Sequence, residues 1–395
     1  MKILIVGSKE ESLIAENQLK KGHQIVGYCD CFYFGGNKED SVFSIDEINK
    51  IQCDLIILTI RNLALSSDLK QILIIEKNIR PEKILEFYRM YEASIPMMKV
   101  DNVMTNPNYL EYDGLILGIS HSEVGIITKY LNKSFCNLAV SSQDLYFNLK
   151  TLEYCISNYY EKIKNLQYAV IDMFDYTYFN YDVSLSKTAI SYWSWGGYNL
   201  DGHNFNLNKN FTYSFDQVVN HFKSQRFWGI TEADVDAWES LFTNIFSYNN
   251  YNDFANVRGI EYRLQTVSDE QLKSFNSEVS IMRNKYEETI NENIKIFDTL
   301  LSTLKKLNPD IKIHVLLMPK YVEIENRISP NREMWKKYFE DKIMSFKKLY
   351  NFEYHNLKNC TEISSHKMYY FDPVHLNYIG AINFTKYLNK LIFVK

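Results

Sequence analysis

Two short segments, far apart in the sequence, carry residue types that together can activate a hydroxyl group. Residues 114–125 begin with an apolar run that stops just before Ser120, and Asp372 and His375 lie three residues apart, ahead of the last apolar segment, 376–391. A serine hydroxyl becomes a good nucleophile when a histidine takes its proton and a carboxylate orients that histidine. The pattern therefore predicts acyl transfer through Ser120, with His375 as the base and Asp372 as the residue that orients it.

The residues that follow Ser120 leave two questions open. Ser122 could carry the reactive hydroxyl itself, although a serine directly before Glu123 is also typical of the N-cap of a helix. His121 could assist a leaving group, but the sequence shows no carboxylate partner for it, which favours a place in the wall of a substrate pocket. We predict Ser120 as the nucleophile and His121 as a substrate contact.

The second half of the chain has the pattern of a parallel sheet with helical crossovers. The expected strands are residues 115–118, 136–140, 168–173, 312–317 and 352–356, and the expected helices are residues 123–131, 145–164, 285–307, 332–349 and 376–391. These elements predict an α/β fold with a doubly wound, flavodoxin-like, parallel five-stranded sheet. Reactive groups in such a sheet belong at the carboxyl ends of the strands, where Ser120, Ser142, Asp175 and the Asp372 loop all fall.

The first 100 residues predict a smaller, Rossmann-like α/β domain. Strands are expected at residues 2–6, 24–29 and 55–59, helices at 10–21 and 45–51, and a final helix and linker at 81–99. The glycines that let a backbone approach a pyrophosphate are missing after Gly7, and Asp30 is a single acid where a ribose would be held. Two interpretations stay open: a degenerate domain that docks a partner or positions the other half, and true dinucleotide binding. The predicted domains are residues 1–100 and 101–395.

Residues 177–264 interrupt the second domain with a stretch rich in Tyr, Trp, Asn and Gly, in which only residues 232–246 have a clear helical pattern. Because this stretch follows the third strand, we expect an insertion over the same edge of the sheet, acting as a lid or recognition region. Trp193 and Trp195 alternate as in a strand and could form a platform for sugar rings. They could equally form the insertion's own small core.

Three blocks of sequence resemble those of the SGNH or GDSL hydrolase superfamily, and more narrowly its acyl-ester hydrolases and glycan O-acyltransferases. Gly118-Ile-Ser120 stands where the family carries Gly-Asp-Ser, Asn137-Leu-Ala-Val-Ser-Ser-Gln143 resembles the second block, and Asp372-Pro-Val-His375 matches the last block, Asp-x-x-His. The resemblance implies a Ser-His-Asp triad and an oxyanion hole formed by backbone N–H groups of Ser120 and Ser142. We count Gln143 among the substrate contacts.

The third block departs from the family pattern. Asp172-Met-Phe-Asp175 stands where the family presents Gly-x-Asn-Asp, so the asparagine donor has no equivalent in register. Removing one oxyanion donor typically costs about a hundred- to a thousandfold in rate. The changes resemble the acyltransferase side of the superfamily more than its simple esterases, and Asp175 is expected near the substrate.

Composition excludes several other classes of protein. The 395 residues have a formal net charge of −4, which provides no basic field for nucleic acid phosphates. Apolar runs are too short for a signal peptide or a membrane span, so we expect a soluble, cytoplasmic protein. The six cysteines and eight histidines show no disulfide framework or metal-binding spacing, and no cofactor is expected.

The sequence thus predicts a serine-dependent acyl-ester hydrolase or O-acyltransferase that acts on an acylated carbohydrate or a cell-surface glycan precursor. An acyl donor such as acyl-CoA is a candidate partner, and the N-terminal domain could support docking or homo-oligomer formation. The alternative is a non-catalytic scaffold or carbohydrate-binding protein of glycan assembly. That alternative predicts that Ser120, Asp372 and His375 do not converge.

Overall fold

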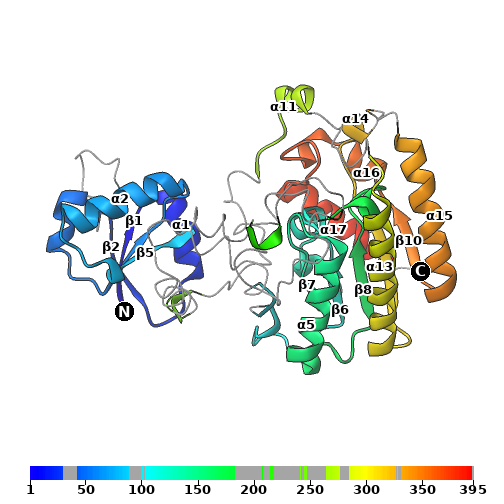
Figure 1. Ribbon diagram of the computed structural model, residues 1–395, viewed down its shortest axis with the longest axis horizontal. Helices are drawn as coiled ribbons and strands as arrows, with labels where there is room; N and C mark the ends of the chain where they lie inside the picture. The colour runs from blue at the N-terminus through cyan, green and yellow to red at the C-terminus, as the bar shows by residue number, and fades with distance from the viewer. Residues whose placement is uncertain are drawn as a thin grey trace.

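In the computed structural model, most of the chain folds into two α/β units. The described residues are 1–29, 42–88, 99–101, 103–182, 264–275, 284–325 and 331–393, with the short stretches 214–217 and 244–246 and the single residues 207, 241 and 327. Each unit contains one five-stranded sheet in which every strand pairing is parallel. Figure 1 shows the two sheets at opposite ends of the molecule.

The first sheet has the strand order β3-β2-β1-β4-β5. Its unit consists of β1 (Lys2–Val6), α1 (Lys9–Gln18), β2 (Gln24–Cys29), β3 (Val42–Phe43), the 3₁₀ helix η1 (Ile45–Lys50), β4 (Leu55–Leu58), α2 (Leu63–Ile75), the 3₁₀ helix η2 (Pro81–Lys83) and β5 (Ile84–Glu86). This order is the one found in Rossmann-like folds, in agreement with the sequence prediction. The predicted helix over residues 81–99 is wrong at its start, because residues 84–86 pair with β4 as a fifth strand.

The second sheet has the strand order β10-β9-β8-β6-β7, which is the flavodoxin-like order. Its strands are β6 (Gly114–Leu117), β7 (Phe135–Asn137), β8 (Tyr168–Asp172), β9 (Lys312–Leu317) and β10 (Glu353–Asn356). Its helical elements are α4 (Ser120–Gly125), η3 (Thr128–Tyr130), α5 (Leu145–Ile163), η4 (Tyr178–Asn180), α11 (Asp269–Ser274), α13 (Glu287–Leu307), α14 (Val322–Glu325), α15 (Arg332–Tyr350), α16 (Thr361–Ser364), η6 (Lys367–Tyr369) and α17 (Tyr378–Phe393). Chain order reverses between β6 and β8, and in such sheets ligands bind at this switch point.

Helices cover both faces of the second sheet. Alternate residues of β6 point to opposite cores: Leu115 and Leu117 pack with α5, α13 and α15, whereas Ile116 packs with α17. Figure 1 shows α5, α13 and α15 side by side over one face. Burial on both faces explains why the strands read as continuous apolar runs rather than as alternating patterns.

The start of the predicted insertion belongs to this core. Residues 177–182 are buried, and the Asn293 side chain of α13 donates hydrogen bonds to the carbonyls of Phe179 (3.0 Å) and Tyr181 (2.8 Å). Most of residues 183–264, including most of the predicted helix over 232–246, lies outside the described residues. The prediction of a lid or recognition region therefore stays a prediction.

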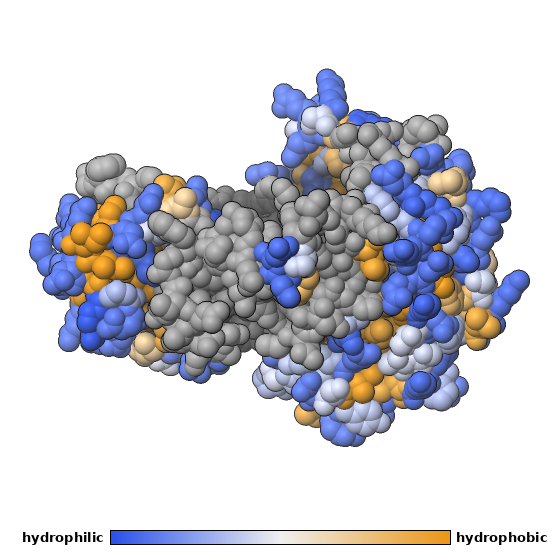
Figure 2. All heavy atoms as spheres, viewed as in Figure 1, coloured by the Kyte–Doolittle hydropathy of each residue, from blue (hydrophilic) through white to orange (hydrophobic). Residues whose placement is uncertain are grey.

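Two properties of the described surface and helices bear on partners. Leu65, Ile72 and Ile75 of α2 are exposed, and Figure 2 shows a hydrophobic patch on the unit that carries the first sheet. Among the described residues, no helix is both long enough and apolar enough to cross a bilayer.

Candidate active site

Ser120 lies at the carboxyl edge of the second sheet, directly after the switch-point strand β6. The strand ends at Leu117, Gly118 and Ile119 form the turn, and Ser120 is the first residue of α4, where it is half-buried. A Cβ atom on Gly118 would lie 2.6 Å from Cβ of Asp172 and 2.5 Å from Oγ of Ser122. Glycine is therefore required for the turn after β6 to approach the end of β8.

Asp372 and His375 come from the loop before α17 and reach the same edge. The Ser120 Oγ and His375 Nε2 atoms are 2.8 Å apart, and His375 Nδ1 is 2.8 Å from Asp372 Oδ2. The other carboxylate oxygen of Asp372 accepts the backbone N–H groups of Val374 (2.9 Å) and His375 (2.7 Å). With Nδ1 protonated toward the carboxylate, Nε2 is free to accept the serine proton.

The start of α17 fixes this loop. The Asn377 side chain accepts the N–H of Gly380 (2.9 Å) and donates to the carbonyl of Met368 (2.7 Å), so it caps the helix and holds the preceding loop. The ring of Phe371 stacks on that of His375, with centroids 5.7 Å apart.

The electrostatic surroundings keep Asp372 ionised. Burial raises the pKa of its carboxyl, but the neighbouring His375 and the two backbone N–H donors outweigh burial and leave the pKa below its ordinary value. Asp372 and His375 side chains are 20% and 17% exposed, so the pair is partly shielded yet lies next to solvent. A carboxylate in this position can orient the imidazole and stabilise its protonated form.

His121 lies against the catalytic candidate His375, with ring centroids 4.6 Å apart. It is 4% exposed, and neither of its ring nitrogens has a hydrogen-bond partner in the part of the chain that the structure describes. Burial, followed by the electrostatic influence of the neighbouring His375 and Lys320, holds the pKa of His121 well below its ordinary value. His121 is therefore a neutral imidazole in the wall beside His375.

The predicted oxyanion loop consists of residues 138–144, between β7 and α5. Ser142 has a left-handed backbone (φ +62°), and its carbonyl accepts the hydroxyl of Tyr181 (2.9 Å), while the carbonyl of Gln143 accepts that of Tyr178 (2.7 Å). These two bonds from residues 178–181 fix the loop's backbone. The N–H of Ser142 has no hydrogen-bond partner among the described residues.

Two predicted substrate contacts are occupied inside the protein. The Gln143 amide is buried and donates to Asn148 and Thr151 of α5, at 3.1 and 3.3 Å. Asp175 is buried between Lys320 and Lys358, to which it is bonded through its Oδ2 atom. Although burial raises the pKa of Asp175, the two lysines hold it well below its usual range. Both side chains are buried, and Oε1 of Gln143 has no hydrogen-bond partner among the described residues. Their assignment as substrate contacts stays a prediction.

Trp193 and Trp195, the predicted sugar platform, lie outside the described residues. Their assignment as substrate contacts stays a prediction.

Sequence reasoning missed the role of Asp172, the last residue of β8. Its two carboxylate oxygens accept the N–H groups of Ser122 (3.1 Å) and Phe174 (2.8 Å), so one side chain ties the start of α4 to the turn after β8. Burial raises the pKa of Asp172 to about 6. The sequence feature that could have revealed this role was the position of Asp172 in the third block, where an aspartate stands in place of the family's glycine.

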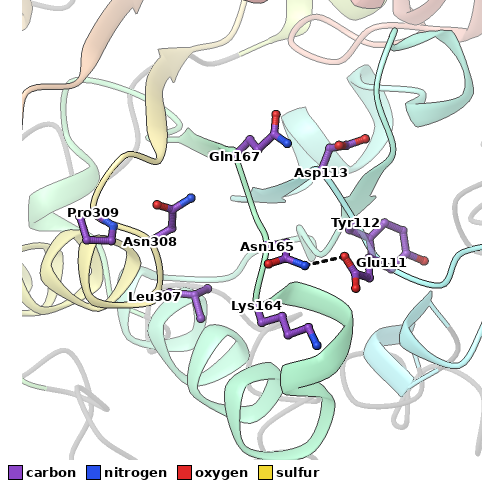
Figure 3. Close-up of a pocket in the computed structure, with 9 residues that line it drawn as sticks. All are labelled: Glu111, Tyr112, Asp113, Lys164, Asn165, Gln167, Leu307, Asn308 and Pro309. Atoms are coloured by element: carbon purple, nitrogen blue, oxygen red, sulfur yellow. Dashed lines mark hydrogen bonds between the residues drawn. The ribbon is translucent and has the colours of Figure 1, made fainter.

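A separate cavity of about 680 Å³ lies at the opposite edge of the second sheet. Figure 3 shows it between residues that precede β6 and β8 and the end of α13, among them Asp113, Gln167 and Asn308. The Asn165 side chain donates to Glu111 across it (2.7 Å). Because these residues precede their strands, the cavity faces away from Ser120.

Comparisons with known proteins add a distant likeness in structure. No model of a known protein family matches the chain, and no curated protein matches it. A Streptococcus pneumonia protein provisionally described as a platelet activating factor aligns with 9% identity and a TM-score of 0.35, covering 84% of this chain and 99% of its own. A Bacteroides fragilis protein provisionally described as an acylhydrolase aligns with 9% identity and a TM-score of 0.34, covering 76% and 96%. At this level of similarity the function has to be argued from the site itself.

Proposed function

We propose that the protein is a serine-dependent acyl-ester hydrolase or O-acyltransferase of the SGNH type, with Ser120, His375 and Asp372 as its catalytic triad. The observation that carries the proposal is the continuous chain of two 2.8 Å contacts from the Ser120 hydroxyl through His375 to Asp372. The non-catalytic alternative expects these side chains to lie apart. Their hydrogen-bond distances favour the enzyme.

The proposed reaction begins when Nε2 of His375 takes the proton of Ser120 and the serine oxygen attacks the ester carbonyl. The C–O double bond opens to an oxyanion, which the N–H groups of Ser120 and Ser142 stabilise. The first N–H of a helix has no partner within the helix, and no described residue accepts the N–H of Ser142, so both are proposed as oxyanion donors. The tetrahedral intermediate then expels the alcohol, which receives the proton from His375, and leaves an acyl group on Ser120.

The second half of the reaction repeats these steps with a new nucleophile. His375 takes a proton from water or from a sugar hydroxyl, whose oxygen attacks the acyl-enzyme, and Ser120 recovers its proton as it leaves. Water gives hydrolysis, and a sugar gives O-acyl transfer. Both outcomes use the same three side chains, so the acceptor alone distinguishes them.

The residues around the triad fit a positively charged imidazolium intermediate. The neutral ring of His121 adds no repulsive charge at 4.6 Å, and Lys320 and Lys358 nearby are paired with the carboxylates of Asp175 and Glu325. His121 then serves as an uncharged wall of the pocket. Both of its ring nitrogens are buried and have no hydrogen-bond partner among the described residues.

An acylated carbohydrate or glycan precursor is the proposed substrate class, and acyl-CoA is a candidate donor. This part of the proposal rests on the resemblance of the sequence blocks and on the partial solvent exposure of Ser120 at the sheet edge. The N-terminal unit is proposed to dock a partner or a second copy.

The test is ester hydrolysis by the purified chain. We expect hydrolysis of p-nitrophenyl acetate by the wild-type protein, and a fall of at least about a thousandfold in kcat for Ser120→Ala. Ser122→Ala is the matched comparison, because its hydroxyl instead donates to the carbonyl of Ile119 (3.1 Å). Full activity in Ser120→Ala, or a larger loss in Ser122→Ala, would refute the assignment. Adding an acylated donor with and without a glycan acceptor then separates hydrolysis from transfer.

A further inference from the structure

A buried lysine that precedes the second sheet in sequence reaches the loop after β7. The side chain of Lys99 is 2% exposed, and its ammonium group donates to the carbonyl of Ala139 and lies 3.4 Å from Oε1 of Glu123, which is also 2% exposed. A buried charge is costly unless it is paired and hydrogen-bonded. In this structure Lys99 meets both conditions through its contacts with the loop after β7 and with α4.

Glu123 joins this lysine to the same loop by a second route. It lies three residues after Ser120 in α4, and its other carboxylate oxygen accepts the hydroxyl of Ser141 at 2.5 Å. Lys99 and Glu123 therefore hold Ala139 and Ser141, the residues before the proposed oxyanion donor Ser142. The nucleophile helix and the oxyanion loop are tied together by one buried ion pair.

The backbone that carries Lys99 is itself fixed to the second unit. Asp101 accepts the hydroxyl groups of Tyr154 (2.8 Å) and Tyr159 (2.7 Å) from α5, and Val100 and Met104 are fully buried in the core of the second unit. Lys99 is therefore presented to the loop from a rigid support. Lys99 contacts residues of the second unit, although the predicted domain boundary after residue 100 places it in the first domain.

We infer that Lys99 is a positioning residue, which sets the geometry of the oxyanion loop by pairing with Glu123 and holding Ala139. Without the ammonium group, the loop loses its bond at Ala139 and the buried Glu123 carboxylate loses a charged partner, which favours movement of the loop or of α4. A displacement of about 1 Å in a catalytic group can cost about a hundredfold in rate. The catalytic consequence rests on the proposed function, whereas the effect on the loop does not.

The experiment compares Lys99→Met with Lys162→Met. Both replacements remove an ammonium group and keep the length of the side chain, but Lys162 donates to the carbonyl of Tyr109, away from the site. Hydrogen–deuterium exchange is measured on peptides covering residues 138–144. We expect exchange at least about tenfold faster in Lys99→Met and unchanged exchange in Lys162→Met, because only the first loses a bond to this loop.

The kinetic arm measures ester hydrolysis by the same proteins. We expect kcat to fall about 10- to 100-fold in Lys99→Met with KM within about twofold, since an oxyanion donor acts in the transition state. Lys99→Arg, which keeps the charge, should restore part of kcat. The melting temperature of each variant is also recorded. A general loss of folded protein would lower the apparent kcat and the melting temperature together, whereas a displaced loop lowers kcat alone.

The outcomes separate the two proposals. If the wild-type protein is active and Lys99→Met leaves both loop exchange and kcat unchanged, the positioning role is overturned while the proposed function stands. If the wild-type protein shows no activity, the proposed function fails, and loop exchange alone decides the role of Lys99. If Lys99→Met does not fold, Glu123→Gln decides, because it removes the negative charge with which Lys99 pairs: faster loop exchange supports the inference, and unchanged exchange overturns it.

Discussion

Asp172 gives the stability of this protein a pH dependence that a single substitution should remove. Its side chain is completely buried, and burial raises its pKa from 3.8 to about 6. An acid whose pKa is higher in the folded state stabilises the fold while it is protonated, and this contribution is lost as the pH rises through the folded-state pKa. At about 1.4 kcal/mol per pKa unit, the difference corresponds to about 3 kcal/mol.

The free energy of unfolding of the wild-type protein should therefore fall relative to that of Asp172→Asn as the pH rises from about 4 to 7.5. At low pH the protonated Asp172 and the asparagine each offer one carbonyl acceptor, whereas the ionised Asp172 accepts N–H groups on both oxygens. Its relative stability should improve by about 2.4 kcal/mol across this range, because it carries no buried charge at neutral pH and part of the difference lies below pH 4.

Urea unfolding at half-unit pH steps, monitored by circular dichroism, measures this difference. The contributions of the other titrating groups to the free energy of unfolding are the same in both proteins and cancel in the difference. Asp341→Asn is the matched control, because Asp341 is exposed and solvent screens its charge. A difference between wild type and Asp172→Asn that stays constant within about 0.5 kcal/mol across the range would refute the reasoning.

Three further substitutions probe the site and its support. Asp372→Asn should lower kcat for ester hydrolysis by about 10³- to 10⁴-fold, because an amide does not hold His375 in the required tautomer; a loss below tenfold would contradict this role. Gly118→Ala should abolish Ser120-dependent hydrolysis and lower the melting temperature, since a Cβ there has no room; a fully active, equally stable variant would be contrary to the structure. Lys358→Met should reduce the free energy of unfolding in urea by about 3–5 kcal/mol by leaving buried Asp175 with one lysine, and a change below about 1 kcal/mol would argue against the ion cluster.

The longer elements of the fold could be predicted from the sequence because their apolar patterns are strong. The strand over residues 312–317 and the start of the helix at Arg332 agree with the structure to the residue. Strands β3 and β5, with two and three residues, are too short to show a pattern. The predicted helix over 123–131 is wrong in its bounds: α4 ends at Gly125, and Ile126 and Ile127 continue in extended conformation into the core.

The site was predictable where chemistry depends on residue type and spacing. The convergence of Ser120, Asp372 and His375 could be predicted because Ser120 follows a buried strand and the Asp-x-x-His segment precedes the last helix, at the edge where reactive groups gather. The contacts that support the site could not be predicted, because a buried lysine such as Lys99 has no sequence signature. Lys320 and Lys358 offered one usable signal, since both come shortly after predicted strands at the same edge.

The central claim is that the hydroxyl of Ser120 is an activated nucleophile, and covalent labelling tests it most directly. The purified protein is treated with a fluorophosphonate, and the modified peptide is identified by mass spectrometry. We predict one adduct, on Ser120, that disappears in Ser120→Ala and forms much more slowly in His375→Ala, which lacks the group 2.8 Å from the serine oxygen. No adduct on the folded wild-type protein, or an adduct on a different serine, would contradict the account.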